Sequence, residues 1–270
     1  MLYLKNAQQV SHIDVLDRGF HYGDGCFTTA RIRHNQIELY DRHLARLKHS
    51  NQKLSLNSNL DLITESLELL RELESELNGT LKIILSRGTG QRGYSLPDHP
   101  ADLWLFYYPQ TLQDFNFEQI QSGVLQQALG LTMPNLVGLK TLNRLEQVLL
   151  KQEADQRGWP EALVTDVQGG IVEGVSSNCF IRINNTWITP ELRYNGVFGV
   201  MRAEILQRMQ EQGISCQQRG IDLDEIPHIQ SLFFCNALSP MKIVTQFEQQ
   251  TLDGDACIEL FNRLRLNQIS

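Results

Sequence analysis

Strand-like and helix-like segments interleave irregularly along this chain of 270 residues, and this irregularity limits the possible folds more than any other feature. A doubly wound sheet needs strands and helices that alternate at regular spacing. Here residues 26–40 contain two strand patterns in succession, with a turn at His34-Asn35, and a second such pair turns at Asn184-Asn185. We therefore expect an α+β fold built from two mixed α/β domains.

A polar segment near the middle of the chain predicts the domain boundary. Residues 109–119 read PQTLQDFNFEQ and form the only plausible linker. We expect a small N-terminal α+β domain over residues 1–109, a linker over 110–120 and a larger C-terminal mixed domain over 121–270. Lys140 then belongs to the C-terminal domain.

Local periodicity predicts the remaining helices and strands. Ser58 or Asn59 is expected to cap the second helix. The predicted helices cover residues 41–54, 58–78, 143–158, 200–212 and 257–266. The predicted strands cover residues 81–86, 101–108, 124–133, 161–167, 214–219 and 231–236.

Charge and cysteine content exclude several classes of protein. The 24 basic and 31 acidic residues give a formal charge of -7, and no long basic run occurs, so nucleic acid and membranes are not expected partners. No apolar stretch approaches the roughly 18–20 residues that span a bilayer. The start, MLYLKNAQQV, lacks a signal-peptide pattern, and five cysteines without a CxxC pair suit reduced thiols in the cytoplasm. Dispersed histidines predict no metal site.

A glycine-rich loop resembles a nucleotide-binding motif, but its context excludes one. Gly88, Gly90 and Gly93 spell GxGxxG after a strand, yet two prolines follow where a dinucleotide site requires a helix. The same loop carries Arg87 and Arg92. These arginines indicate either an ordinary surface loop or a substrate loop that binds a carboxylate.

Lys140 is the first candidate for covalent chemistry. It ends an apolar segment in NLVGLKTLNRLEQVLL, just before a predicted helix. An amine in apolar surroundings loses proton affinity and becomes a nucleophile that can form a Schiff base. The alternative is a lysine that extends to solvent at a helix start.

Glu173 is a candidate buried carboxylate. It ends a β-branched run in GGIVEGVSSNCFIRI and is followed by the small polar residues Ser176, Ser177 and Asn178. A buried carboxylate needs a cationic partner, and a protonated pyridine nitrogen is one such partner. The alternative is a solvated glutamate at a strand end.

Two further features could bind an anion. At helical spacing, Arg46 shares a face with Leu47 and Leu54, so it points inward and needs either a phosphate or an acidic side chain. The segment from Gly199 through Arg202 begins a helix whose N–H groups can bind an anion. Asn236-Ala237 follow a strand and could add another N–H and a side-chain amide.

Taken together, these segments resemble one family. VxEGxxSNxF, the lysine before LNRLEQVL, the arginine in HLARL, and GVMR are similar to the fold type IV pyridoxal-phosphate enzymes, which include branched-chain and D-amino-acid aminotransferases. DRGFHYGDGCFTTAR, LKIILSRGTGQRGYS and CNALSPM resemble most the aminodeoxychorismate lyases of that family. The resemblance covers residues from about 17 to 241.

The resemblance implies a fold, a reaction and a homodimer. The cofactor, pyridoxal 5'-phosphate, would lie between the two domains, and a partner subunit would contribute to each pocket. The implied reaction converts 4-amino-4-deoxychorismate to 4-aminobenzoate and pyruvate in folate biosynthesis. The alternative is an aminotransferase that acts on a small amino acid.

The resemblance also implies roles for individual residues. The implied catalytic residues are Lys140, Glu173 and Thr29. The implied cofactor-binding residues are Arg46, Lys140, Glu173, Asn178, Val200, Met201, Asn236 and Ala237. The implied substrate-binding residues are Thr29, Lys82 and Arg92. The aminotransferase tyrosine that binds the cofactor's phenolic oxygen has no counterpart here, and Asn143 or Arg144 lies near its position.

Overall fold

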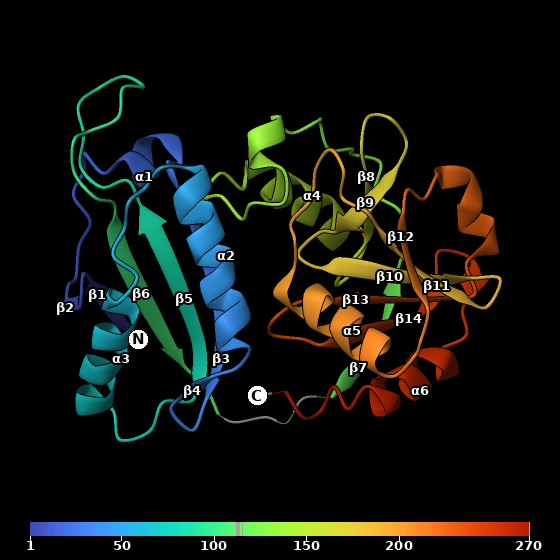
Figure 1. The fold of residues 1–270 in the computed structure, drawn as a ribbon. Coiled ribbons are helices and arrows are strands. Elements are labelled where there is room, and N and C mark those ends of the chain that lie inside the picture. Colours follow the sequence, from blue (N-terminus) through green and yellow to red (C-terminus); the bar gives the residue numbers. More distant parts are fainter. Residues whose placement is uncertain (112–113, 115, 270) are drawn as a thin grey trace. The chain divides into compact units, whose positions relative to one another are not determined.

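The structure, a computed structural model, describes residues 1–111, 114 and 116–269 (Figure 1). It divides into two compact units, which are described separately. Unit 1 comprises residues 1–113, 139–143 and 270, and unit 2 comprises residues 114–138 and 144–269. Lys140 thus belongs by its contacts to unit 1, whereas the sequence analysis assigned it to the C-terminal domain.

Unit 1 is built on a six-stranded antiparallel sheet with the order β2-β1-β6-β5-β3-β4. Its central strands alternate buried and partly exposed residues, as expected of strands with one face against a core. The strands are β1 (Leu2–Lys5), β2 (Gln8–Gln9), β3 (Gly25–Arg33), β4 (Gln36–Ile37), β5 (Gly79–Ser86) and β6 (Asp102–Pro109).

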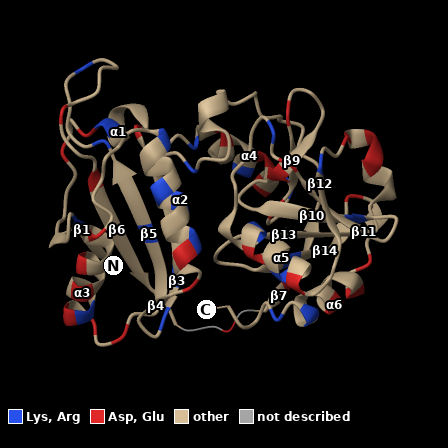
Figure 2. Ribbon diagram, in the orientation of Figure 1, with Lys and Arg blue, Asp and Glu red and all other residues tan. Residues whose placement is uncertain are grey.

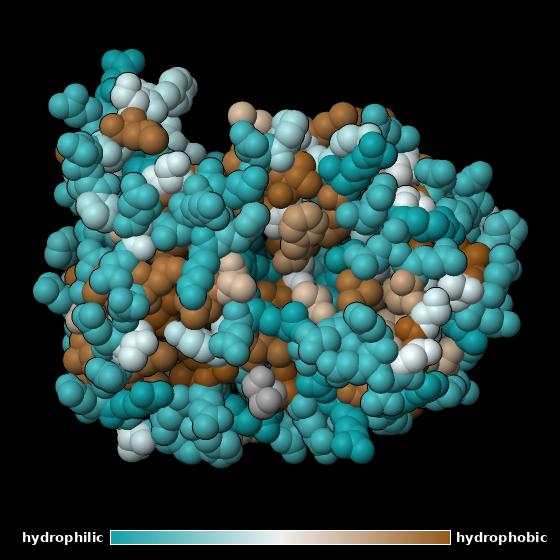
Figure 3. Space-filling view, in the orientation of Figure 1, coloured by the Kyte–Doolittle hydropathy of each residue, from teal (hydrophilic) through white to brown (hydrophobic). Residues whose placement is uncertain are grey.

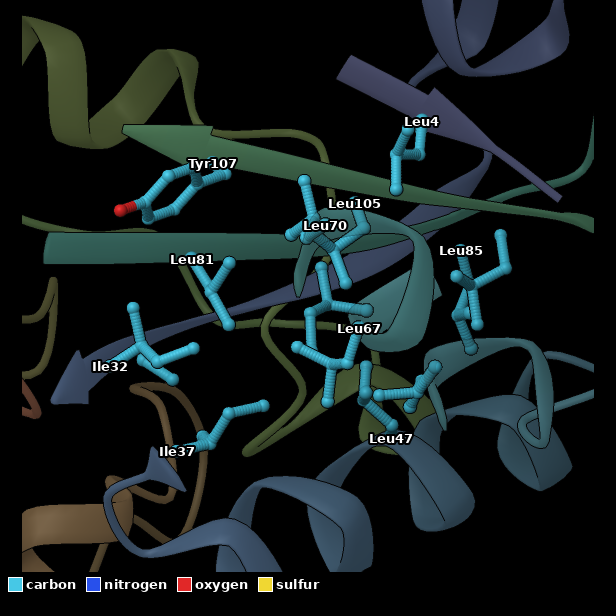
Figure 4. Packing of buried hydrophobic residues seen from close by; sticks show 14 of the residues in the cluster. Leu4, Ile32, Ile37, Leu47, Leu67, Leu70, Leu81, Leu85, Leu105 and Tyr107 are labelled. Atoms are coloured by element: carbon cyan, nitrogen blue, oxygen red, sulfur yellow. The ribbon is translucent and has the colours of Figure 1, made fainter. Parts of the chain in front are cut away.

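Two helices, α2 (Tyr40–Lys53) and α3 (Leu62–Leu73), cover one face of this sheet, and a short helix, α1 (Arg18–Tyr22), precedes β3. Figure 4 shows the resulting core, in which Leu47 of α2 and Leu70 of α3 pack toward Leu81 and Leu105 of the sheet. Each such side chain, when fully buried, stabilises the fold by roughly 1.5–3 kcal/mol. The opposite face of the sheet carries the side chains of Phe27, Thr29 and Lys82.

Unit 2 contains a seven-stranded sheet in the order β12-β11-β10-β13-β14-β15, with β7 paired to β14. A separate two-stranded sheet joins β8 and β9. The strands are β7 (Phe117–Ser122), β8 (Leu163–Thr165), β9 (Ile171–Gly174), β10 (Asn178–Ile183), β11 (Thr186–Pro190), β12 (Cys216–Arg219), β13 (Ser231–Cys235), β14 (Met241–Phe247) and β15 (Gln250–Thr251).

The described residues of unit 2 form three α-helices and two short 3-10 helices. Two apolar clusters form its core, one around the large sheet and one around α4 and the β8-β9 pair. The α-helices are α4 (Leu145–Gln156), α5 (Val200–Glu211) and α6 (Asp255–Arg263), and the 3-10 helices are η1 (Pro134–Leu136) and η2 (Leu223–His228).

Both predicted hairpins are confirmed. Strands β3 and β4 turn at His34-Asn35, and β10 and β11 turn at Asn184-Asn185. All four turn residues have positive φ, between 46° and 65°. Asparagine tolerates this left-handed conformation better than most residues, and two-residue hairpin turns of this kind require it.

Two predicted elements are wrong in extent. The helix predicted over residues 58–78 covers only Leu62–Leu73. Before it, the Asn59 side chain accepts the Asp61 N–H and forms a turn. After it, the Leu77 N–H donates to Asn35 Oδ1 instead of to a carbonyl oxygen of the helix. The strand predicted over 124–133 is absent apart from isolated bridges. The carboxylate of Glu153 accepts the N–H groups of Gln126 and Gln127 there, so these groups do not bond to a neighbouring strand.

The predicted linker and domain bounds stay predictions. Residues 112, 113 and 115 of the linker lie outside the described residues. Residues 117–120 of the predicted linker belong to β7, which pairs in parallel with β14. Apolar alternation in FNFEQI is too weak to predict this strand from the sequence.

Charged and apolar residues are mixed over the surface of each unit. Figure 2 shows basic and acidic residues interspersed on α2, α3, α5 and α6, and Figure 3 shows hydrophilic residues over much of the visible face. No helix of the described chain is long and apolar enough to cross a bilayer. The five cysteines are free thiols, and the described residues contain no cluster of metal-ligating side chains.

Candidate active site

The segment 139–143 places Lys140 on the edge of β3. The Phe27 N–H donates to the Lys140 carbonyl oxygen at 2.9 Å, and the Leu142 N–H donates to the Gly25 carbonyl oxygen at 3.0 Å. Strand β4 pairs with β3 only at Ile32 and Arg33, so the first half of this edge is open to the lysine segment. The backbone of Lys140 is therefore fixed by strand-like hydrogen bonds.

Phe27 brings two lysines to one face of the sheet. Lys140 Nζ lies 4.9 Å from the centre of the Phe27 ring, and Lys82 Nζ lies 4.8 Å from it. Thr29 is the register partner of Lys82 on the neighbouring strand β5, and it shares the face of Phe27 because side chains alternate along β3. Burial lowers the pKa of Lys82. Three of the predicted residues thus gather at this face: Thr29, Lys82 and Lys140.

Arg46 points from α2 toward the other face of β3. Its Nη1 donates to Thr28 Oγ1 at 3.3 Å. The Thr28 hydroxyl also lies 2.6 Å from His43 Nδ1. The prediction that Arg46 points inward is therefore correct.

The glycine-rich loop carries two arginines with different environments. Arg87 is buried; it donates to the carbonyl oxygens of Leu54 and Ser55 at the end of α2 and pairs with Asp24 at 3.1 Å. Arg92 is exposed, with no hydrogen bond or ion pair among the described residues. Only Arg92 has a guanidinium available for a ligand.

The loop itself is anchored to α1. Arg18 Nη1 donates to the Gly93 carbonyl oxygen at 2.8 Å, and the Gly93 N–H donates to the Tyr22 hydroxyl at 3.0 Å. No helix follows Gly88–Gly93 in residues 87–100. The chain therefore lacks the helix N-terminus that a dinucleotide site would need in this loop.

In unit 2, Glu173 is a buried carboxylate at the end of β9. It is 6% exposed, so the solvated alternative is wrong. Its Oε2 accepts the Val197 N–H at 2.9 Å and Asn178 Nδ2 at 3.2 Å. The guanidinium of Arg144 lies near enough for Glu173 to raise the pKa of Arg144, although burial lowers that pKa more. The Glu173 carboxylate thus accepts two donors and lies near a cation.

The start of α5 lies beside this carboxylate. Asn178 Nδ2 also donates to the Val197 carbonyl oxygen at 2.9 Å. A Cβ on Gly199, the N-cap of α5, would lie 1.8 Å from Asn178 Oδ1, so only glycine permits this approach. Gly199 supplies no side-chain cap, so no capping side chain binds the N–H groups of Val200 and Met201.

Arg202, in the same GVMR segment, has a structural role. Its Nε donates to Thr189 Oγ1 at 3.1 Å, and its Nη2 donates to the Pro190 carbonyl oxygen at 2.9 Å. This buried arginine therefore links α5 to strand β11 through hydrogen bonds.

Asn236 and Ala237 form a turn after β13. The Asn236 N–H donates to the Ser239 carbonyl oxygen at 2.8 Å, and its Oδ1 accepts the N–H groups of Leu238 and Ser239. Its Nδ2 lies 3.5 Å from the Ser176 carbonyl oxygen. The Ala237 N–H has no acceptor among the described residues. Asn236 therefore shapes the turn, and the Ala237 N–H is the group that the turn presents.

Residues 25–247 match the family described as "Amino-transferase class IV". The chain belongs to this family. Aminodeoxychorismate lyase of Vibrio harveyi is 31% identical over 240 residues, which are 88% of either chain. The crystal structure of 4-amino-4-deoxychorismate lyase from Pseudomonas aeruginosa has a TM-score of 0.86 at 31% identity and covers 98% of each chain. D-alanine aminotransferase of Bacillus licheniformis is 25% identical over 253 residues, 90% of this chain and 86% of its own.

Membership of the class IV family confirms the predicted fold class, with mixed helices and sheets in each unit. The roles of individual residues stay predictions, although the structure places each side chain. Sequence reasoning missed Thr28, Phe27 and Val197 as neighbours of the candidate residues. Strand alternation along β3 could have indicated the first two, whereas Val197 lies in an irregular segment without any periodic signal.

Proposed function

We propose that this chain is a pyridoxal-phosphate-dependent lyase that converts 4-amino-4-deoxychorismate to 4-aminobenzoate and pyruvate. One observation carries the proposal: the relative and the solved structure that bear this activity in their names are each 31% identical over most of the chain. The D-alanine aminotransferase is less similar, at 25% identity.

The groups present in the chain suit pyridoxal phosphate. Such a cofactor needs a lysine amine, a carboxylate for its pyridine nitrogen and donors for its phosphate. Lys140 supplies the amine, and Glu173 supplies a buried carboxylate already held by two N–H donors. Arg46 and the uncapped start of α5 supply a guanidinium and backbone N–H groups, the donors that phosphate prefers.

Each of these residues has a separate task in the reaction. Bound pyridoxal phosphate supplies the electron sink for the substrate's amine-bearing carbon. Lys140 Nζ removes the proton from that carbon. Glu173 keeps the pyridine nitrogen protonated, while Asn178 holds the Glu173 carboxylate in place. Loss of pyruvate then leaves an aromatic ring, which makes the reaction strongly favourable.

The substrate carries carboxylates, and the described residues offer cations for them. Lys82 and Arg92 are proposed to bind these carboxylates, with the Thr29 hydroxyl beside Lys82 on the same face of the sheet. Burial lowers the pKa of Lys82, and a carboxylate bound beside it would favour its charged form. Arg92 lies on a loop whose base is fixed by Arg18.

A homodimer is part of the proposal. Helix α4 exposes Leu145, Val148 and Leu149, at 71%, 61% and 44%. A groove of about 840 Å³ runs along the same helix and is lined in part by Val148 and Val175. Apolar side chains in such a row favour a protein partner.

A cytoplasmic location stays a prediction from the sequence.

Product analysis tests the proposed reaction. The purified protein is mixed with 4-amino-4-deoxychorismate without any keto acid, and pyruvate and 4-aminobenzoate are quantified together. Equal yields of the two, absent with Lys140→Ala, are expected for the lyase. A cofactor-loaded protein that yields no pyruvate would instead indicate the aminotransferase, and amino transfer to a series of keto acids would then be measured.

A further inference from the structure

A hydroxyl buried between β3 and α2 connects Arg46 to a histidine. Thr28 is fully buried, and His43 is 2% exposed. Thr28 Oγ1 lies 2.6 Å from His43 Nδ1 and accepts a hydrogen bond from Arg46 Nη1 at 3.3 Å. All three side chains belong to unit 1.

The chemistry of the three groups fixes the direction of both hydrogen bonds. A guanidinium only donates, so the Thr28 oxygen is the acceptor for Arg46. The single proton of the hydroxyl has no other acceptor among the described residues, so it is donated to His43 Nδ1. His43 is therefore a neutral acceptor, and burial followed by the charge of Arg46 lowers its pKa to about 3.

This arrangement has a cost that packing alone does not explain. His43 Nε2 is buried and has no hydrogen-bond partner in the described structure. An apolar side chain of similar size would avoid that unpaired nitrogen. The histidine thus contributes one interaction, the acceptor for the Thr28 proton, and this interaction orients the hydroxyl lone pairs toward Arg46.

We infer that Thr28 and His43 are positioning residues that hold the Arg46 guanidinium in the orientation required for the cofactor phosphate. The inference rests on the proposed function, since that function assigns the phosphate to Arg46. Neither side chain needs to touch the cofactor. Loss of either one removes or misdirects the Thr28 acceptor of Arg46 Nη1 and weakens recognition of the phosphate, while recognition of the pyridine ring is unchanged.

Two ligands that differ only in the phosphate test this inference. The dissociation constants of the cofactor-free full chain are measured for pyridoxal phosphate and for pyridoxal. The constant for pyridoxal divided by the constant for pyridoxal phosphate reports the contribution of the phosphate. Thr28→Val is expected to reduce this ratio by about tenfold, and Thr28→Ser, which keeps the hydroxyl, is expected to retain it. Thr80→Val, on strand β5, is the matched control and keeps the wild-type ratio.

A second variant separates positioning from general damage to the fold. His43→Phe removes the acceptor but keeps a ring, and its ratio is expected to fall as in Thr28→Val. The double variant is expected to lose no more than either single one, because both break the same connection. An unchanged ratio in folded Thr28→Val, or in His43→Phe if Thr28→Val does not fold, overturns the inference. A wild-type protein that binds no pyridoxal phosphate would instead overturn the proposed function itself.

Discussion

The Phe27 N–H donates to the Lys140 carbonyl oxygen at 2.9 Å, and the Phe27 ring lies 4.9 Å from Lys140 Nζ. One residue of β3 thus fixes both the backbone and the amine of Lys140. Five residues of the 139–143 segment lie against unit 1, although the residues before and after it belong to unit 2. This placement explains how a lysine in an irregular segment can hold a defined position.

Lys140→Ala is expected to abolish turnover and the visible absorbance of bound pyridoxal phosphate, because the amine proposed to form the Schiff base is lost. The thermal unfolding temperature is expected to stay close to wild type, since the backbone hydrogen bonds of the segment remain. Lys151→Ala, which removes an exposed lysine paired with Asp155, is the control and keeps the absorbance. Activity in the Lys140 variant would contradict its assignment.

Glu173→Gln is expected to lower kcat by about 10²–10³-fold, because the charge that keeps the pyridine nitrogen protonated is lost. The glutamine oxygen can still accept from Val197 and Asn178, so the fold is retained. Glu153→Gln changes a carboxylate that accepts two backbone N–H groups, and it is expected to affect stability rather than kcat. Steady-state kinetics on both variants distinguish the two roles, and a near-native kcat in Glu173→Gln would exclude the proposed partner of the nitrogen.

Gly199→Ala tests the close approach of Asn178 to the start of α5. The added Cβ would lie 1.8 Å from Asn178 Oδ1, so the amide must move and its hydrogen bond to Glu173 is broken. We expect weaker binding of pyridoxal phosphate by about tenfold and a lower kcat. Gly130→Ala is the control, because its Cβ meets no atom within 4 Å. Equal behaviour of the two variants would show that the contact has no role.

Substitutions of the two loop arginines are expected to affect different properties, stability for Arg87 and substrate binding for Arg92. Arg87→Ala removes the donor of two carbonyl oxygens and one of the two arginines that pair with Asp24, which Arg18 still binds. It is expected to reduce the free energy of unfolding by about 1–3 kcal/mol. Arg92→Ala changes an exposed side chain and is expected to alter stability by less than about 0.5 kcal/mol while KM rises. Urea denaturation and substrate titration measure the two effects. An unchanged KM in Arg92→Ala would remove this residue from the substrate site.

His43 is expected to make stability depend on pH. Burial, followed by the charge of Arg46, lowers the pKa of His43 from 6.5 to about 3, so the unfolded chain binds this proton more readily than the folded one. Its contribution is therefore complete above pH 6.5 and is lost as pH falls toward 3, by up to about 1.4 kcal/mol per pH unit. Denaturant midpoints measured across this range are expected to fall less steeply for His43→Phe. Parallel curves for the two proteins would show that His43 is not the group responsible.

Much of the secondary structure and the chemical types at the site could be predicted from local sequence patterns. The pairs His34-Asn35 and Asn184-Asn185 predicted both hairpin turns, and helical periodicity predicted that Arg46 points inward. These features depend on neighbours within a few residues, so a linear pattern is sufficient to detect them. The motif around Lys140 and Glu173 likewise indicated the family, which the match over residues 25–247 shows.

The partners of these residues, in contrast, depend on how distant segments pack together. The tertiary structure assigned Arg87 to the end of α2 and left Arg92 exposed, although both lie in one glycine-rich loop. It also placed Thr28 against His43, 15 residues away, and Glu173 against Val197, 24 residues away. Hydrogen bonds between segments distant in the chain depend on the packing of whole strands and helices. A local sequence pattern does not specify that packing, so these bonds could not be predicted from it.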